Sequence, residues 1–341
     1  MITTRRRTAS AALLLSATLA LSACAGQTPA GQTTPSPETS AASTPAAPST
    51  ATVTVEDNHG TQSVTVPPTS VVATDNRLFQ TLQEWGITLA AAPLPLFPGD
   101  LAYATDTSIV DLGLHSEPNL EAVVAVQPDL IINGQRFASF YNDLKALVPD
   151  AAIVELDPRE GQPFDAELKR QVTVLGEVFA QQDKAAALVA DFDASIARVK
   201  AAYDPGQKVM AVITSGGEIN YAAPGAGRTL GPVFEILGLT PALSVDGSTD
   251  HQGDDISVEA IADSNPDWIL VMDRDAGVGG EAGDGNYTPA NELLANSEAL
   301  QNVTAVKEQR IVYMPQYTYL NEGIQTYTTF FNAFADALEK A

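Results

Sequence analysis

Three arginines stand out in this strongly acidic chain. Its 341 residues include 18 lysines and arginines against 42 aspartates and glutamates, and only eight arginines follow residue 24. Arg136 lies eight residues after Pro128, and Arg274 lies eight residues after Pro266. A guanidinium group stays charged and forms paired hydrogen bonds to oxygen anions. We expect a Gly- and Pro-rich loop from Gly216 to Gly227, which leads to Arg228. Arg136, Arg228 and Arg274 together predict a site for an anion.

Histidine and tyrosine side chains lie at similar places in the sequence. His251 belongs to the polar stretch 247–255, and Tyr317 and Tyr319 follow an apolar run at 311–314. Imidazole and phenolate groups can both bind a hard or borderline metal ion such as Fe(III). We therefore expect His251, Tyr317 and Tyr319 to join the arginines in one cleft.

Each of these residues also has a simpler interpretation. A single arginine is commonly a surface residue paired with a local acid, and Asp273 and Asp275 flank Arg274. His251 alone could be a solvated loop histidine, His59 a hairpin-turn residue, and His115 a loop residue. The shared offset of Arg136 and Arg274 favours function over these alternatives.

Motifs of enzyme sites are missing from the sequence. The three histidines lack the paired spacing of a zinc enzyme, and Ser215-Gly216-Gly217 does not fit the Gly-x-Ser-x-Gly elbow of serine hydrolases. The glycines of Gly277–Gly285 are not followed by the Lys-Ser/Thr of a phosphate loop, and we expect a mobile loop beside the cleft there. The sequence thus predicts a binding protein with no intrinsic cofactor.

A repeat organises the chain around these residues. Residues 119–132 and 257–270 share a helix-capping residue, Glu two positions later, then Ala, and Pro-Asp before an apolar run. A capping side chain and an early Glu suit a helix start, and proline ends the helix. We interpret the two segments as equivalent parts of two lobes.

Apolar runs that alternate with helical patterns predict an α/β fold. The predicted strands are Ser70–Ala73, Leu130–Asn133, Ala152–Leu156, Val209–Thr214, Trp268–Met272 and Ile311–Met314. Open α/β sheets bind ligands beyond the carboxyl ends of their strands, which is where the arginines, His251 and the tyrosines fall. The two lobes would then present these residues to one cleft.

A helical stretch without strand patterns separates the two lobes. We expect a helix capped by Asp183 and running to about Ala202, with Leu188, Phe192, Ile196 and Val199 on one stripe. At 1.5 Å per residue it would be about 30 Å long and could join the lobes. The fold class predicted is two Rossmann-like α/β lobes joined by one long interlobe helix.

The N-terminal segment has the pattern of a lipoprotein leader. Arg5, Arg6 and Arg7 precede an apolar stretch that ends in Leu-Ser-Ala-Cys24, and Cys24 is the only cysteine. A basic start, a short apolar core and small residues before the cut are typical of a secretory signal. We predict that Cys24 is lipidated and that the protein is anchored to the outer face of the cytoplasmic membrane.

The domain organisation follows from these patterns. We predict a signal peptide at 1–23, a lipidated cysteine and Ala/Thr/Ser/Pro-rich tether at 24–50, a first lobe at 51–163, a helical connector at 164–203 and a second lobe at 204–341. A hairpin is expected at the start of the first lobe, with alternating residues at 52–55 and 64–66 around Asp57-Asn58-His59-Gly60. A formal net charge of −24 argues against nucleic acid as a partner, and we expect a monomer.

From about Thr52 onward the chain resembles the substrate-binding lipoproteins of iron–siderophore ABC importers, most closely the branch that binds catecholate siderophores. The motifs that carry the resemblance are Asn58-His59-Gly60, Glu117-Pro118-Asn119-Leu120-Glu121, Gln127-Pro128-Asp129-Leu130-Ile131-Ile132, Val271-Met272-Asp273-Arg274 and Tyr317-Thr318-Tyr319-Leu320. The resemblance implies the class III periplasmic-binding-protein fold, with little hinge closure, and an Fe(III)–siderophore as the transported ligand.

The resemblance also implies residue roles. Arg136, Arg228 and Arg274 would neutralise the anionic ligand, and His251 and Tyr319 would complete the coordination of iron when the siderophore leaves two positions open. Glu121 and Glu259 would dock on arginines of the ABC permease, although a glutamate in the first turn of a helix also has a purely local role.

Other functions fit the same features less closely. A haem or cobalamin receptor would share the architecture. A lipid-anchored hydrolase would need an activated nucleophile or a metal, and a structural adhesin or sensor would leave the cleft without a ligand.

Overall fold

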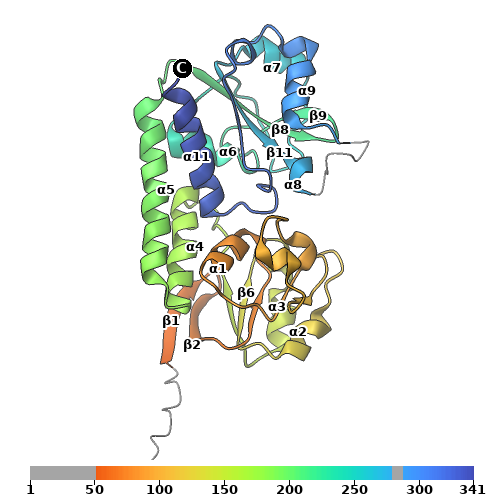
Figure 1. Ribbon diagram of the computed structural model, residues 1–341, viewed down its shortest axis with the longest axis vertical. Helices are drawn as coiled ribbons and strands as arrows, with labels where there is room; N and C mark the ends of the chain where they lie inside the picture. The colour runs from red at the N-terminus through yellow and green to blue at the C-terminus, as the bar shows by residue number, and fades with distance from the viewer. Residues whose placement is uncertain (1–50, 279–286) are drawn as a thin grey trace, which may run out of the picture. The chain divides into compact units, whose positions relative to one another are not determined.

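The computed structural model describes residues 51–278 and 287–341. The predicted signal peptide, Cys24 and the tether lie outside these residues. Residues 279–285, which make up most of the loop predicted at Gly277–Gly285, also lie outside them. The described residues form one compact unit, whose lobes and connecting helices are drawn in Figure 1.

A five-stranded parallel sheet, in the order β5-β4-β3-β6-β7, forms the first lobe. Its strands are β3 (Val71–Ala73), β4 (Ala91–Ala92), β5 (Val110–Asp111), β6 (Leu130–Asn133) and β7 (Ala152–Glu155). The sheet is surrounded by the 3-10 helices η1 (Asn76–Leu78), η2 (Leu94–Leu96), η3 (Ala102–Thr105) and η4 (Gln135–Phe140) and by α1 (Phe79–Glu84), α2 (Leu120–Val126) and α3 (Tyr141–Leu147). The chain moves outward in opposite directions from β3 and β6, so the sheet has its topological switch point between these two strands.

The second lobe has a sheet in the order β10-β8-β11-β12, with β9 paired antiparallel to β8. Its strands are β8 (Lys208–Ser215), β9 (Glu218–Tyr221), β10 (Thr240–Pro241), β11 (Trp268–Asp273) and β12 (Ile311–Tyr313). Its helices are α6 (Gly231–Leu237), α7 (Val258–Ser264), α8 (Arg274–Gly277), α9 (Ala290–Asn296), η5 (Glu298–Leu300), α10 (Thr304–Lys307) and α11 (Ile324–Leu338). The two central strands, β8 and β11, run parallel along six paired residues.

The expected strands are all present, and four short ones were not predicted. β4, β5 and β10 have two residues each, which is too short for a periodic pattern. β9 lies inside the Gly- and Pro-rich segment expected to be a loop between Gly216 and Gly227. That expectation was wrong because Gly216 and Gly217 both adopt positive φ and form the tight turn of a β8–β9 hairpin.

Two helices, α4 (Phe164–Val178) and α5 (Gln182–Ala202), occupy the stretch between the sheets. In Figure 1, α5 runs along both lobes, with α4 beside one end and α11 beside the other. Phe192, Ile196 and Val199 are buried on α5, and Leu188 packs against the same core, as the apolar stripe predicted.

The predicted cap of this helix was wrong. Asp183 is the second residue of α5, and its N-cap is Gln181, whose side chain makes no capping bond. The chain reverses at Ala180, which has a φ of 52°, and Gln181 donates its N–H to Gly176 at 2.8 Å. The helix therefore begins directly after the turn, and Asp183 acts as a negative charge near its N-terminus.

The sequence repeat corresponds to a repeated structure. Asn119 caps α2 by accepting the N–H of Ala122, and Ser257 caps α7 by accepting the N–H of Ala260. Each helix ends at a residue in the left-handed conformation before the proline, with φ of 47° at Gln127 and 42° at Asn265. A central strand follows in both lobes, so the prediction of equivalent parts is confirmed.

The aspartate of each Pro-Asp pair ties its strand to the neighbouring one. Asp129 accepts the N–H of Thr69 at 2.7 Å and that of Ser70 at 3.0 Å, and Asp267 accepts the N–H of Lys208 at 2.7 Å. These bonds join the start of a central strand to the start of its parallel partner, which sets the register of the pair.

The predicted N-terminal hairpin is formed by β1 (Ala51–Asp57) and β2 (Gly60–Val66). His59 lies in its two-residue turn, as expected. Its Nε2 lies 3.0 Å from Oε1 of Glu155, at the end of β7, so the hairpin is attached to the first lobe.

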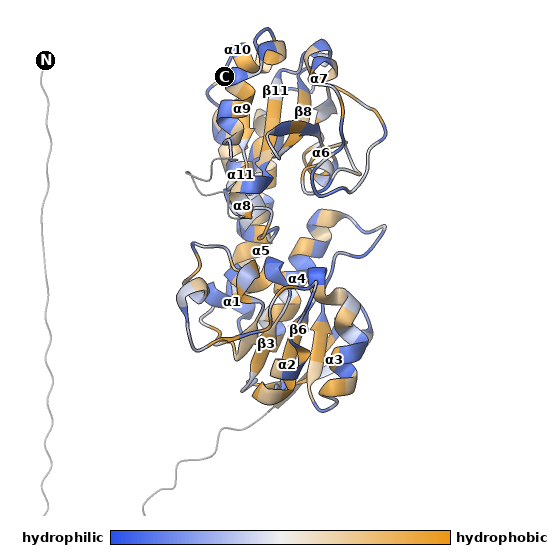
Figure 2. Cartoon of the chain, turned by 90° about the vertical axis from the view of Figure 1, so that its right-hand side faces the viewer, coloured by the Kyte–Doolittle hydropathy of each residue, from blue (hydrophilic) through white to orange (hydrophobic). Residues whose placement is uncertain are grey.

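Apolar strands form the centre of each lobe, and the helices around them carry both hydrophobic and hydrophilic residues (Figure 2). Among residues 51–278 and 287–341, no helix combines the length and the apolar character needed to cross a bilayer.

Candidate ligand-binding site

The structure brings the three predicted arginines together around one tyrosine ring. The guanidinium carbons of Arg136, Arg228 and Arg274 lie 5.0, 4.9 and 4.8 Å from the ring centroid of Tyr319. These distances are within the range of cation–π attraction, which offsets part of the repulsion among the cations. Arg136 comes from the first lobe and the other three residues from the second, so the site lies between the lobes.

A buried turn after β6 presents Arg136. Gly134 has a φ of 156°, and a Cβ atom there would lie 2.6 Å from Oδ2 of Asp75. The next residue, Gln135, has a φ of 51° and donates its N–H to Asp157 at 2.8 Å. Arg77 forms ion pairs with both aspartates beneath the turn. Only glycine fits the first position without moving this cluster, so the backbone that leads to Arg136 is tightly held.

Another tight turn presents Arg228. Gly227 donates its N–H to Ala223 at 2.7 Å, and a Cβ on Gly227 would lie 2.5 Å from the backbone nitrogen of Ala223. The Nη2 of Arg228 lies 2.9 Å from Oε2 of Glu322, whose other oxygen accepts the hydroxyl of Thr229. Burial opposes the charge of Arg228, but the Glu322 carboxylate outweighs this effect, and the pKa of Arg228 is raised above its ordinary value.

Arg274 is the first residue of α8, directly after β11. Its Nη1 lies 3.0 Å from Oδ1 of Asp275, which is the local ion pair that the flanking acids suggested. The other flanking acid, Asp273, instead caps α8 by accepting the N–H of Ala276. In the second sheet the chain also moves outward in opposite directions from β8 and β11, so this sheet has its switch point between them. Arg136, after β6, and Arg274, after β11, therefore occupy equivalent positions at the two switch points.

The segment that carries Tyr319 is hydrogen-bonded to the first lobe. The side chain of Asn76 donates to the carbonyl of Leu320 at 2.5 Å, and Asn321 donates to Gln80 at 2.7 Å. Gln325, in the first turn of α11, exchanges hydrogen bonds with Thr81. Tyr319 is 5% exposed, and these bonds fix it relative to both lobes.

Arg136 differs from the other arginines of the described residues, because it is the one without an acidic partner within 4 Å there. Its Nε and Nη2 atoms are buried and have no hydrogen-bond partner. A buried donor without a partner is unfavourable by about 1–3 kcal/mol, and more for a charged group. The site therefore favours a ligand that brings acceptor oxygens to Arg136.

Two cavities meet at these side chains. A polar cavity of about 720 Å³ is lined by His115, Arg136, Arg228, Ser248, Thr249, Asp250, His251 and Tyr319. A second cavity of about 780 Å³ shares His115, Arg136 and Tyr319 with the first and adds Arg274 and a largely apolar wall that includes Leu96, Phe97, Leu114, Tyr317 and Leu320. The space around the cations thus has a polar part and an apolar part.

His251 and Tyr317 lie in different parts of this space. The ring of His251 is 6.4 Å from that of Tyr319, and its Nδ1 lies 3.9 Å from Asp250. Tyr317 lines the apolar cavity, where a Cβ on Gly99 would lie 2.9 Å from its hydroxyl. The structure therefore places His251, but not Tyr317, next to Tyr319 in the polar part.

His115 is a residue that sequence reasoning left out of the site. It lies in a loop, as expected, but it lines both cavities, and its Nδ1 is buried without a hydrogen-bond partner. Burial, and then the nearby charge of Arg136, lower the pKa of His115 below its ordinary value. Its position three residues before the Pro118-Asn119 motif gave no periodic signal that could have identified it.

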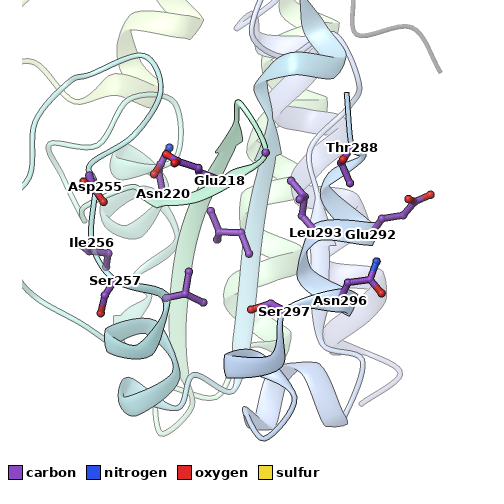
Figure 3. Close-up of a pocket in the computed structure, with 13 residues that line it drawn as sticks. Glu218, Asn220, Asp255, Ile256, Ser257, Thr288, Glu292, Leu293, Asn296 and Ser297 are labelled. Atoms are coloured by element: carbon purple, nitrogen blue, oxygen red, sulfur yellow. The ribbon is translucent and has the colours of Figure 1, made fainter. Parts of the chain in front are cut away.

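A third cavity, of about 570 Å³, lies within the second lobe and shares no residue with the other two. Figure 3 shows Glu218, Asn220 and Asp255 on one side of it and Glu292 and Asn296 on the other. The charged side chains of its lining are all acidic, so this cavity does not suit an anion.

The two predicted docking glutamates occupy equivalent positions. Glu121 and Glu259 are each the second residue of their helix, α2 and α7, and both are exposed. Neither forms an ion pair among residues 51–278 and 287–341.

Comparison with known proteins agrees with this architecture. Residues 71–318 match the periplasmic binding protein family, and the chain belongs to that family. The petrobactin-binding protein YclQ of Bacillus subtilis is 27% identical over 289 residues, which cover 83% of this chain and 86% of the relative. The ferric-anguibactin-binding protein FatB of Vibrio anguillarum is 29% identical over 253 residues, covering 73% and 77%.

Solved structures have the same fold. The crystal structure of YclQ from Bacillus subtilis superimposes with a TM-score of 0.72 at 24% identity, covering 85% of this chain and all of that one. The periplasmic catecholate-siderophore binding protein VctP of Vibrio cholerae gives a TM-score of 0.71 at 23% identity, with 85% of this chain and 100% of VctP covered. The fold class predicted from the sequence is thereby confirmed, and the family consists of binding proteins rather than enzymes.

Proposed function

We propose that this protein captures a ferric siderophore, of the catecholate type, between its lobes and delivers it to an ABC permease. The observation that carries the proposal is the convergence of Arg136, Arg228 and Arg274 on the ring of Tyr319. The relatives YclQ and FatB, which are named for binding petrobactin and ferric anguibactin, support the same class of ligand.

The site has the chemistry that a ferric catecholate requires. Catecholate oxygens are anionic acceptors that match the paired donors of guanidinium groups. The planar guanidinium and Tyr319 can also stack against aromatic catechol rings. Arg136, with two buried nitrogens unpartnered, is the first contact we assign to the ligand.

We assign His251 and Tyr319 as ligands of iron when the siderophore leaves coordination positions open. Their neighbouring rings in the polar cavity support this assignment. Imidazole nitrogen and phenolate oxygen both suit Fe(III). We assign His115 to contact with the ligand and Tyr317 to the wall of the apolar cavity.

The cellular role completes the proposal. Lipidation at Cys24 would hold the protein on the outer face of the cytoplasmic membrane, with residues 24–50 as a tether, a first lobe at 51–163, a connector at 164–203 and a second lobe at 204–341. Glu121 and Glu259, equivalent and exposed in the two lobes, would form ion pairs with arginines of the permease. The protein would act as a monomer, because one copy supplies all of the groups assigned to the ligand.

A titration tests the binding function. Purified protein is mixed with ferric complexes of catecholate, hydroxamate and citrate ligands while intrinsic fluorescence is recorded, and haem and cobalamin are titrated in parallel. We expect quenching at micromolar or lower concentrations of the catecholate complexes. No binding of any ferric complex, together with a Soret band from bound haem or tight binding of cobalamin, would contradict the proposal.

A further inference from the structure

The three guanidinium groups around Tyr319 do not carry equal free charge. Arg228 is paired with Glu322 at 2.9 Å, and Arg274 is paired with Asp275 at 3.0 Å. Arg136 has no such partner among the residues that the structure describes. Two of the three cations are thus compensated by the protein itself, and one is free.

Both compensating acids are fixed in place by donors other than the arginines. Glu322 accepts the hydroxyl of Thr229, and its side chain is 10% exposed. Asp275 accepts the N–H of Gly216 at 2.6 Å and the hydroxyl of Ser215 at 3.4 Å. Because each carboxylate would lose these bonds by moving away, both remain beside their arginines when a ligand enters.

We propose that Glu322 and Asp275 are specificity-determining residues that set the site for a ferric complex with a single negative charge. This inference rests on the proposed function. Each catechol binds iron as a dianion, so Fe(III) with three catechols carries three negative charges, and Fe(III) with two carries one. The single charge matches the one guanidinium without an acidic partner. The larger complex would bring three negative charges to a site where Glu322 and Asp275 already offset two of the guanidinium groups and where Asp250 lines the polar cavity.

The positions left open by the smaller complex fit the same site. Two catechols supply four of the six donors that Fe(III) takes, and His251 and Tyr319 lie together in the polar cavity beside Arg136 and Arg228. To bind iron, Tyr319 would release its phenol proton to solvent, and the resulting phenolate would lie beside the three guanidinium groups. With this phenolate included, the smaller complex places two negative charges in the site, against three for the larger complex.

Two defined probes test this inference. They are the ferric complexes of a synthetic bis-catecholamide and of a tris-catecholamide with the same catechol groups, and their dissociation constants are measured by fluorescence quenching and calorimetry. We expect the wild type to bind the singly charged complex more tightly. Glu322→Gln and Asp275→Asn each remove one negative charge and should improve the relative affinity for the triply charged complex by about tenfold.

The control is Glu308→Gln, which neutralises an exposed acid 3.8 Å from Arg310 and outside the site. It should leave the ratio of the two affinities unchanged. Glutamine at 322 can still accept the Thr229 hydroxyl, and Asp275→Asn provides a second test if the first variant unfolds.

The outcomes separate the inference from the proposed function. If the wild type binds the triply charged complex more tightly, and both variants leave the ratio unchanged, the charge selection is wrong while siderophore binding stands. If neither ferric complex binds, both proposals fail.

Discussion

Arg136 and Tyr319 meet across the two lobes, with the guanidinium carbon 5.0 Å from the ring centroid. They are 183 positions apart in the sequence. The residue next to Arg136, Gln135, donates to Asp157 of the first lobe, and the residue next to Tyr319, Leu320, accepts from Asn76, which also belongs to the first lobe. The contact therefore depends on the relative position of the two lobes, and it lies at the centre of the proposed site.

The Arg136→Ala variant should lose affinity for ferric catecholates without losing stability. Removal of charged hydrogen bonds to the ligand should cost about 1–3 kcal/mol of binding free energy. The free protein should be as stable as the wild type or more so, because Nε and Nη2 of Arg136 are buried without partners. Fluorescence titration and thermal unfolding measure the two effects. Arg310→Ala is the control for binding, and a destabilised Arg136→Ala protein with unchanged affinity would contradict the assignment.

Tyr319 should act through both its ring and its hydroxyl. Tyr319→Ala removes the ring that three guanidinium groups face and should weaken binding by about 1–2 kcal/mol. Tyr319→Phe keeps the ring, so it should retain most of the affinity for complexes with six donors. For complexes with four donors it should shift the visible charge-transfer band, because the phenolate is lost. An unaltered spectrum in Tyr319→Phe would remove Tyr319 from the iron ligands.

Gly227→Ala should damage the turn that presents Arg228. A Cβ at this position would lie 2.5 Å from the nitrogen of Ala223 and 2.6 Å from the carbonyl carbon of Ala222, and backbone atoms cannot easily move away. We expect a loss of stability of about 1–3 kcal/mol together with weaker binding. Gly206→Ala is the matched control, because its new Cβ would meet only the side chain of Asp204, at 3.2 Å. Equal melting temperatures for the two variants would show that the turn can adapt.

Asp129 should contribute stability that depends on pH. Burial alone would raise its pKa, but hydrogen bonds from Thr69 and Ser70 outweigh burial, and the pKa of Asp129 lies below its ordinary value of 3.8. A carboxyl group with a lowered pKa stabilises the fold fully above the unfolded-state pKa, and this contribution is lost as the pH falls through the folded-state value. Asp129→Asn should therefore be less stable than the wild type by about 1 kcal/mol at neutral pH. The difference should begin to shrink as the pH falls below about 3.8 and should disappear only below the lower folded-state pKa of Asp129, as measured by urea unfolding across the pH range. A difference that persists in acid would assign the effect to packing.

Charge reversal at the exposed glutamates should separate binding from transport. Glu121→Arg and Glu259→Arg should bind ferric siderophore as the wild type does, because neither residue lines the arginine cavities. They should reduce iron uptake by cells, because like charges would then face each other at the permease. Glu292→Arg is the matched control, since Glu292 is also exposed in the first turn of a seven-residue helix. Normal uptake in the double variant Glu121→Arg/Glu259→Arg would exclude the docking role.

Much of the architecture could be read from local patterns. The hairpin, six strands of the two sheets, the stripe on α5 and the paired capped helices were predicted, because alternation, periodicity and capping residues are properties of neighbouring positions. Two predictions were wrong, and in both cases a tight turn determines where the neighbouring helix or strand begins. Asp183 was taken as a cap because the reversal at Ala180 gives no sequence signal, and the β8–β9 hairpin was taken as a loop because its strand is short and rich in polar residues.

The sequence by itself determined which groups could do chemistry and on which elements they lie. The offset shared by Arg136 and Arg274 sufficed to place both at the ends of central strands, since strand direction and sheet order follow from local pattern and the handedness of α/β units. Only the tertiary structure decided which charges remain free. Glu322 is 94 positions from Arg228, and no local rule pairs residues so distant. The packing of the two lobes also placed His115 in the site and moved Tyr317 to its apolar wall, because long-range contacts depend on how whole elements are arranged.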